Sequence, residues 1–142
     1  MYDLIIIGGG PAGTSAGVYA SRKQLHTLFA TVDWGGQSIV SPDIQNWIGT
    51  PSISGADLAK DLENHLRTYA GECVAIRDGV TATNLTTTDH GVRVTFSDGN
   101  TEEARAALIA TGSKRRRLPA ENADRFEHKG LTYCATCDGP MF

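Results

Sequence analysis

This 142-residue sequence has no long apolar run, no excess of basic over acidic residues and only three cysteines. No stretch approaches the ~20 consecutive apolar residues of a membrane-spanning helix. The first apolar run, residues 4–7, is short and no basic residue precedes it, so we expect no secretory signal peptide. The 13 Lys and Arg against 16 Asp and Glu give a net charge of −3, which does not support nucleic-acid or anionic-membrane binding. The basic run at 114–117 is expected to be a solvated loop, with phosphate binding as the minority alternative.

The sequence contains three cysteines, Cys73, Cys134 and Cys137. An odd number without a secretory signal indicates a reducing compartment, here the cytoplasm, and argues against a disulfide-stabilised fold. Cys73 begins the apolar stretch 73–76 and is expected in the core. Cys134 and Cys137 form a C-x-x-C motif, which can transfer electrons or supply half of a zinc site. No second C-x-x-C and no histidine pair completes a zinc site, so we favour redox chemistry and expect no metal.

The order of hydrophobic patterns predicts an α/β fold. A strand at 4–7, a glycine turn, a helix over 11–23 and a strand at 27–30 form a βαβ unit, which implies parallel strands. A second helix begins at Ser54, which fits a capping box with Asp57. Further strands are expected at 74–76, which looks buried, and at 80–86, 92–96 and 106–111. These patterns predict a three-layer nucleotide-binding domain with a central parallel sheet and an inserted antiparallel β-meander.

The glycine turn has the spacing G-x-G-x-x-G, with Gly8, Gly10 and Gly13 at its three fixed positions. The first glycine makes the tight turn out of the strand, the second lets the backbone approach a pyrophosphate, and the third lets the helix pack closely. Because the motif follows a predicted strand and opens a predicted helix, dinucleotide binding is favoured over an ordinary glycine turn. The usual acidic residue for the adenosine ribose is missing at 29–31, and Asp33 is expected to follow the strand end. The sequence therefore assigns no residue to the adenosine ribose.

The polar stretch 31–54 is too long for a simple connection between two elements. Its Trp34, Trp47 and Ile48 indicate that it packs against the domain rather than remaining disordered. The stretch contains no cysteine, and the chain after Ser113 turns polar through Phe126 and is interpreted as a linker.

Five strings occur in an order and spacing that resemble a known family. They are DLIIIGGGPAG at 3–13, GGQ at 35–37, IQNWIG at 44–49, ATG at 110–112 and CATCDG at 134–139. Together they resemble the low-molecular-weight thioredoxin reductases (class II pyridine nucleotide-disulfide oxidoreductases) and the flavoprotein subunit of alkyl hydroperoxide reductase, over the whole chain. The strings KGLTYC and CDGPMF are slightly more similar to the hydroperoxide reductase branch.

The resemblance implies an FAD/NAD(P)-binding Rossmann-like domain, present here only in its N-terminal part. The glycine motif would bind FAD through Gly8, Gly10, Pro11, Ala12 and Gly13. By the same resemblance, the positions near the flavin or at the strand-end turn beside the cofactor are Gly36, Gln37, Asn46, Thr111 and Gly112. Gln45 stands where the family commonly has glutamate. Without the resemblance, Asn46 and Trp47 could equally be loop-packing residues.

The resemblance also implies a reaction, in which NADPH reduces FAD, FAD reduces the Cys134–Cys137 disulfide, and the dithiol reduces a thioredoxin- or peroxiredoxin-like protein. Cys137 would face the flavin, Cys134 would attack the partner, and Asp138 would supply a proton. Asp138 could instead be a turn aspartate before Gly139. A C-x-x-C motif can lower a cysteine pKa from ~8.5 to about 7, which favours the attacking thiolate.

The expected domains are 1–117, the N-terminal part of the FAD-binding domain, and 118–142, a linker and the start of the NADPH domain. We expect the chain to be an inactive fragment of an enzyme that is a homodimer when full length, with its NADPH site outside this sequence. A non-catalytic FAD- or nucleotide-binding module is the alternative, and a thiol- or metal-binding protein without flavin is a third possibility.

Overall fold

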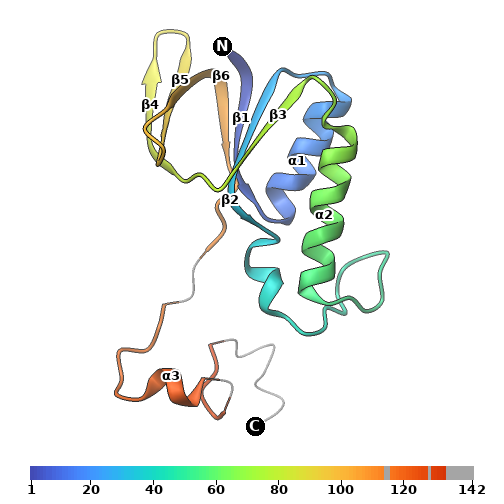
Figure 1. The fold of residues 1–142 in the computed structure, drawn as a ribbon, viewed down its shortest axis with the longest axis vertical. Coiled ribbons are helices and arrows are strands. Elements are labelled where there is room, and N and C mark those ends of the chain that lie inside the picture. The colour runs from blue at the N-terminus through green and yellow to red at the C-terminus, as the bar shows by residue number, and fades with distance from the viewer. Residues whose placement is uncertain (114–115, 128, 134–142) are drawn as a thin grey trace. The chain divides into compact units, whose positions relative to one another are not determined.

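The computed structural model describes residues 1–113, 116–127 and 129–133. The chain divides into two compact units, Met1–Gly112 and Ser113–Phe142. Figure 1 shows the strands and the two long helices of the first unit, and the short helix of the second.

The first unit is built on one six-stranded sheet with the order β3-β2-β1-β6-β5-β4. Its strands are β1 (Tyr2–Gly9), β2 (Thr27–Trp34), β3 (Val74–Asp78), β4 (Ala82–Thr88), β5 (Gly91–Phe96) and β6 (Thr101–Ile109). Strand β1 pairs in parallel with β2 and β6, and β2 pairs in parallel with β3. Strands β4 and β5 continue the sheet from β6 with antiparallel pairing. The predicted α/β fold, with residues 5–7 inside the sheet and an added meander, is confirmed.

Helices α1 (Pro11–Arg22) and α2 (Gly55–Ala70) lie together on one face of the sheet (Figure 1). Ile6, Phe29 and Leu66 are fully buried between the sheet and the helices. Ser54 caps α2 as predicted, since the Asp57 N–H donates to the Ser54 Oγ at 3.0 Å. The Asp57 carboxylate accepts from the Ser54 hydroxyl at 2.6 Å, so only the first half of the capping box is seen. This layer holds the start of α1 against the end of β1, where the glycine motif lies.

The opposite face of the sheet is covered by the meander. Ile5 and Ile7 alternate with Ile6 and point away from the helices, where they pack in one buried cluster with Val94 and Phe96 of β5. A strand with apolar residues on both faces is characteristic of a sheet buried on both sides, which explains the uninterrupted apolar run in β1.

The observed strands differ from the predicted ones in their bounds, and β4 (Ala82–Thr88) lies two residues later than the predicted 80–86. Strand β6 begins at Thr101 and ends at Ile109, because its first residues pair with β5 before its later ones pair with β1. Residues 74–76 were expected to be buried, but β3 is the outer strand of the described sheet and Ala75 is exposed. Strand β2 continues to Trp34, because Thr31 pairs with Asp78 and Trp34 pairs with Gly9.

The second unit contains a short helix, α3 (Ala123–Phe126), where the sequence predicted only a linker. Arg117 forms an ion pair with Asp124 at 3.1 Å, and the backbone of Glu127 bridges to that of Leu131. Over the residues that the structure describes, no helix has the length and apolar character needed to cross a membrane.

Candidate functional site

Two glycines of the motif are required by the packing of the protein itself. Gly8 has φ +119°, and a Cβ atom added to it would lie 2.4 Å from the carbonyl oxygen of Ala110. A Cβ atom on Gly13 would lie 1.8 Å from the carbonyl oxygen of Gly8. The first and third glycines therefore permit the close approach of β1, α1 and the end of β6, as expected for this motif.

Gly10, the middle glycine, has a different environment. It is the N-cap of α1 with φ −77°, and an added Cβ atom would meet nothing nearer than the Cα atom of Gly36, at 3.8 Å. Neither backbone strain nor internal packing therefore requires glycine at position 10. An open backbone at the start of a helix is the feature that a pyrophosphate group needs, because the group must approach the main chain itself.

The first turn of α1 leaves backbone donors available beside Gly10. The Thr14 N–H donates to the Gly10 carbonyl at 3.0 Å and closes the first helical turn. The N–H groups of Ala12 and Gly13 precede this bond and have no acceptor within the helix, and Pro11 at the first helical position has no N–H. No acidic side chain lies in the first turn to oppose an anion.

The turn after β2 brings a second glycine against the first loop. The Gly35 N–H donates to the Gly9 carbonyl at 2.9 Å, and Gly36 then starts the short helix η1 (Gly36–Val40) with φ +56°. A Cβ atom on Gly36 would lie 3.3 Å from the Cα atom of Gly10. We call this close approach of Gly10 and Gly36 the glycine contact. Gln37 follows it on the exposed side of η1.

Asp33 lies within β2, and the expectation that it follows the strand end is wrong. Its side chain is exposed, and its carbonyl oxygen would be 2.4 Å from a Cβ atom on Gly9. The acidic residue therefore lies at the carboxyl end of the second strand, beside the glycine motif. The sequence predicted that the strand ends at Ala30, because the continuous apolar run 28–30 stops there.

Trp34 holds the turn between β2 and η1 against the helices. Its ring stacks on Phe29 with a centroid distance of 5.3 Å, and its Nε1 donates to the Asp78 carboxylate at 3.0 Å. The Arg67 guanidinium of α2 lies 5.3 Å from the Trp34 ring centroid and pairs with Asp78 at 2.7 Å. Hydrogen bonds from Arg67 to Asp78 and Glu63 raise the pKa of the guanidinium, which therefore remains charged. These contacts fix the backbone that leads into Gly35 and Gly36.

The segment between η1 and α2 forms a small hairpin. The backbones of Ile44 and Ile53 exchange two hydrogen bonds of 2.7 and 3.1 Å, and the Thr50 N–H donates to the Trp47 carbonyl at 3.0 Å. Gly49 closes the turn with φ +96°, a backbone angle that few other residues adopt. Part of the long stretch 31–54 is therefore an ordered hairpin. The expectation that Ile48 packs against the domain is wrong, because its side chain lies exposed at the turn.

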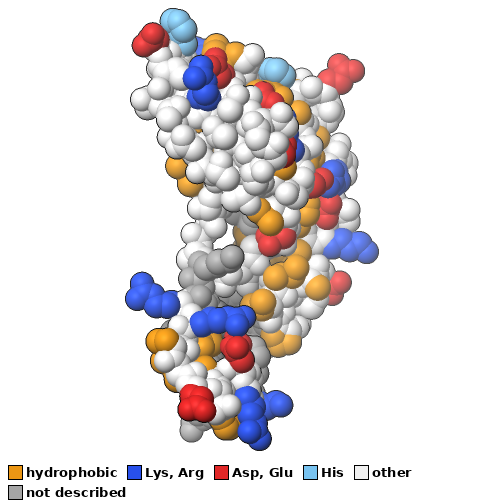
Figure 2. Space-filling model, turned by 60° about the vertical axis from the view of Figure 1, so that its left-hand side comes forward, with side chains coloured by type: hydrophobic (Ala, Val, Ile, Leu, Met, Phe, Trp, Pro, Cys, Tyr) orange, Lys and Arg blue, Asp and Glu red, His pale blue; other side chains and the backbone are white. Residues whose placement is uncertain are grey.

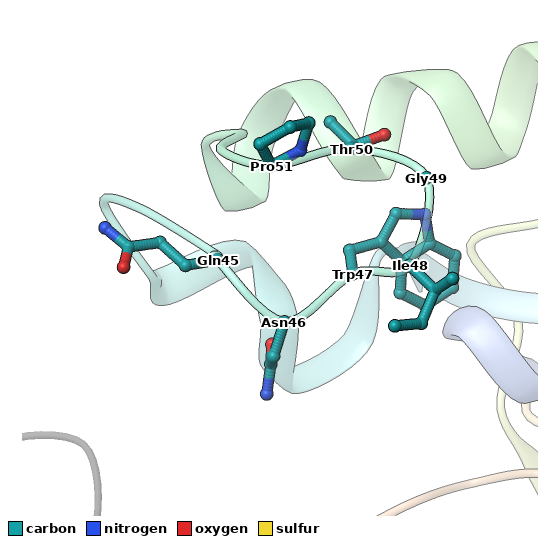
Figure 3. A pocket seen from close by; sticks show the side chains of 7 residues that line it. All are labelled: Gln45, Asn46, Trp47, Ile48, Gly49, Thr50 and Pro51. Carbon is teal, nitrogen blue, oxygen red and sulfur yellow. The ribbon is translucent and has the colours of Figure 1, made fainter.

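Residues 45–51 at the tip of the hairpin line an open pocket of about 350 Å³ (Figure 3). Asn46 is exposed and points away from Thr50 and Pro51 in Figure 3. Trp47 is half-buried, whereas the side chain of Ile48 is 96% exposed. Both Asn46 and Trp47 are therefore accessible to a ligand that lies against the tip.

Thr111 and Gly112 follow the end of β6. The Ala110 N–H donates to the Ile7 carbonyl at 2.8 Å, and the backbone of Thr111 comes close to Gly8. Gly112 has φ +63°, and a Cβ atom added to it would meet no other atom within 4 Å. The predicted residues from Gly8 to Gly13, Gly36, Thr111 and Gly112 thus come from one edge of the sheet.

The predicted redox residues Cys134, Cys137 and Asp138 lie outside the described residues, as does part of the basic run at 114–117. Cys73 is half-buried and packs against the helix-side core, with its thiol donating to the Ala70 carbonyl at 3.2 Å. In the part of the chain that the structure describes, no group of three or more His, Cys, Asp or Glu side chains could hold a metal ion.

The charged side chains on the face shown in Figure 2 are mixed in sign. In Figure 2 basic, acidic and hydrophobic side chains are interspersed, and no single charge dominates the visible face. This distribution agrees with the balanced composition, which gave no support to nucleic-acid binding.

Comparison with known proteins gives consistent results. The family model described as pyridine nucleotide-disulphide oxidoreductase matches residues 2–141. A subunit of the alkyl hydroperoxide reductase of Staphylococcus epidermidis is 36% identical over 141 residues, which are 99% of this chain and 27% of that protein. The thioredoxin reductase of Streptococcus pyogenes has a TM-score of 0.81 at 34% identity, covering 100% of this chain and 45% of that one. For the thioredoxin reductase of T. acidophilum, the TM-score is 0.77 at 32% identity, with 99% of this chain and 45% of that chain covered. The chain thus spans about a quarter of the curated relative and less than half of each solved structure.

Proposed function

The chain belongs to the pyridine nucleotide-disulphide oxidoreductase family, and we propose that it carries the first part of an FAD-dependent protein-disulfide reductase. Residues 1–117 form the N-terminal part of the FAD-binding domain, and residues 118–142 a linker and the start of an NADPH domain. With FAD held at the glycine motif, the Cys134–Cys137 pair would receive electrons that originate from NADPH. The final acceptor in this proposal is a thioredoxin- or peroxiredoxin-like protein, and the name of the thioredoxin reductase relative supports the first of these. The cytoplasm is proposed as the location from the three cysteines and the expected lack of a signal peptide.

The observation that carries this proposal is the glycine contact. Gly10 and Gly36 meet with no side chain between them, beside the free N–H groups of Ala12 and Gly13. Backbone donors and the positive end of the helix dipole suit the pyrophosphate of FAD, and a side chain at position 10 would project into the space that it needs. The residues present therefore fit a dinucleotide.

The two ends of the cofactor are assigned to residues on either side of the glycine contact. Asp33, at the carboxyl end of β2, would accept hydrogen bonds from the hydroxyls of the adenosine ribose, as an acidic residue does in related nucleotide sites. Gln37 and Asn46 would contact the flavin end, and Thr111 and Gly112 would form the turn beside it. When bound, FAD supplies a two-electron carrier between a nicotinamide and a disulfide.

The cysteine pair transfers these electrons to the protein substrate. Reduction of the Cys134–Cys137 disulfide takes up two electrons and two protons, one of them supplied by Asp138. The Cys134 thiolate then attacks the partner's disulfide, forming a mixed disulfide and releasing one partner thiol. Cys137 attacks Cys134 in turn, which releases the second partner thiol and restores the intramolecular disulfide.

Cofactor titration tests the proposal on the chain itself. Purified protein is titrated with FAD and, as a matched control, with riboflavin, while flavin fluorescence and the absorption band near ~450 nm are followed. Because the glycine contact is assigned to the pyrophosphate, FAD is expected to bind at least about tenfold more tightly than riboflavin. Equal affinities, or no binding of FAD, would contradict the proposal.

A further inference from the structure

We propose that Asp43 is a positioning residue, whose carboxylate links the two arms of the hairpin and thereby fixes Asn46 for contact with the cofactor. The inference rests on the proposed function, because it assigns a cofactor contact to Asn46. It adds a residue that belongs to none of the motifs and that acts through the shape of the hairpin.

Both oxygens of the Asp43 carboxylate accept a hydrogen bond, and the two donors lie on different arms of the hairpin. Ser52 donates its hydroxyl to Oδ1 at 2.7 Å, and Gln45 donates its amide to Oδ2 at 2.6 Å. The Ser41 hydroxyl donates to the Asp43 carbonyl at 3.0 Å, and the Ser41 carbonyl accepts from the Gly55 N–H at 2.9 Å. The carboxylate therefore connects the arm that carries Asn46 to the returning arm, and the base of the hairpin is attached to the start of α2.

The hairpin needs such links because its own backbone pairing is short. Ile44 and Ile53 form one bridge, and Trp47 and Thr50 form a second at the turn. Two-stranded hairpins are marginally stable in water unless side chains hold them together. At the tip the large apolar side chain of Ile48 is almost wholly exposed, so it adds little packing. Hydrogen bonds to a charged acceptor are among the stronger polar contacts available to such a structure.

The identity of residue 45 matches this role. The family resemblance leads to the expectation of glutamate there, but this chain has glutamine. An ionised glutamate could only accept hydrogen bonds and would repel the Asp43 carboxylate, whereas the glutamine amide donates to it. The contact also restrains the residue directly before Asn46. Residues 43 and 45 therefore form a matched acceptor and donor in this protein.

The experiment exchanges the hydrogen-bond donor and acceptor between residues 43 and 45. Asp43→Asn removes the acceptor that faces Gln45 and places two amide donors together, and Gln45→Glu places two acceptors together. The double variant D43N/Q45E restores one donor opposite one acceptor with almost unchanged shape. Asp98→Asn is the matched control, because Asp98 is likewise exposed and accepts from Asn100 at 2.9 and 3.0 Å, but in the turn between β5 and β6.

Two measurements are made on the full 142-residue chain. Amide hydrogen exchange at Ile44, Thr50 and Ile53 reports opening of the hairpin, and FAD titration reports affinity and the absorption spectrum of bound flavin. We expect each single variant at Asp43 or Gln45 to exchange about tenfold faster, to bind FAD about tenfold more weakly and to shift the flavin band at saturation. The double variant recovers most of each change, and Asp98→Asn alters none of them.

The outcomes separate this inference from the proposed function. If the wild-type chain binds no FAD, the proposed function fails, and the role given to Asn46 fails with it. If the wild type binds FAD but the single variants match it in affinity and spectrum, only the positioning role is overturned. Loss of binding in the single variants without recovery in the double variant also overturns it, because the pairing of residues 43 and 45 would then not be the cause.

Discussion

A Cβ atom on Gly13 would lie 1.8 Å from the carbonyl oxygen of Gly8, near the end of β1. Two non-bonded atoms cannot approach so closely, so the helix must move away from the strand if residue 13 acquires a side chain. Internal packing thus requires glycine at the first and third positions of the motif. At the second position glycine only leaves the backbone open. Within these six residues, Gly8 and Gly13 are therefore expected to affect stability, and Gly10 to affect ligand binding.

Gly13→Ala is expected to lower the free energy of unfolding by about 3 kcal/mol, because the displaced helix loses contacts with a rigid backbone. Urea denaturation measures the change. Ser15→Ala in the same helix is the control, since Ser15 is exposed and the change should remain within about 0.5 kcal/mol. Equal stability of Gly13→Ala and wild type would show that α1 does not pack this closely.

Gly10→Ala is expected to cost about 1 kcal/mol or less, because the added methyl group meets its nearest atom at 3.8 Å and φ is −77°. The same methyl group projects toward the space assigned to the pyrophosphate, so FAD affinity should fall about tenfold or more. Denaturation and FAD titration of the one variant test both statements. A loss of stability as large as that of Gly13→Ala would refute the assignment of position 10 to the ligand.

Trp34 is expected to contribute to stability through its ring more than through its indole N–H. Trp34→Phe retains stacking on Phe29 but loses the bond to Asp78, and should cost about 1 kcal/mol. Trp34→Ala removes the contacts of the ring with Phe29 and with Arg67 and should cost about 3 kcal/mol. Thermal or urea unfolding of both variants gives the comparison, and equal losses would contradict it.

The pKa of Asp43 is lowered from its ordinary value of 3.8, first by the hydrogen bond from Gln45 and then by that from Ser52. The ionised carboxylate therefore stabilises the hairpin at pH values above 3.8, and the contribution is lost as the pH falls through the lowered pKa. Ser52→Ala removes one donor and should move this pKa upward, toward 3.8. NMR titration of the carboxyl group measures it, with Asp98, whose pKa is also lowered, as an internal reference that should not change.

Cys137→Ser is expected to trap a mixed disulfide between Cys134 and a thioredoxin- or peroxiredoxin-like protein, because the second attack cannot occur. The reduced variant is mixed with the oxidised partner and analysed by non-reducing electrophoresis and mass spectrometry. Cys134→Ser should form no such adduct, and Cys73→Ser should behave as wild type, since Cys73 packs against the core. An adduct formed by Cys134→Ser instead would reverse the assigned roles of the two cysteines.

The start of the domain could be predicted from the sequence because its causes are local. The isoleucine run of β1, the glycine spacing and the helical pattern of α1 each depend on neighbours within a few residues. The same holds for the capping of α2 by Ser54. The C-x-x-C motif is also recognised locally, and its role stays a prediction because Cys134 and Cys137 lie outside the described residues.

Other features were decided only by tertiary structure. Asp33 became part of β2 because β3 and Gly9 pair with the residues around it, and β6 began at Thr101 because β5 pairs with its first residues. In the hairpin that carries Asn46, Ser52 donates to Asp43, a residue nine positions away in the chain. Hydrogen bonds between strands and between hairpin arms join residues that are distant in the chain. Local sequence patterns do not identify such partners. Only the folded chain therefore showed that Asp33 lies beside the glycine motif and that Asn46 lies on the hairpin tip.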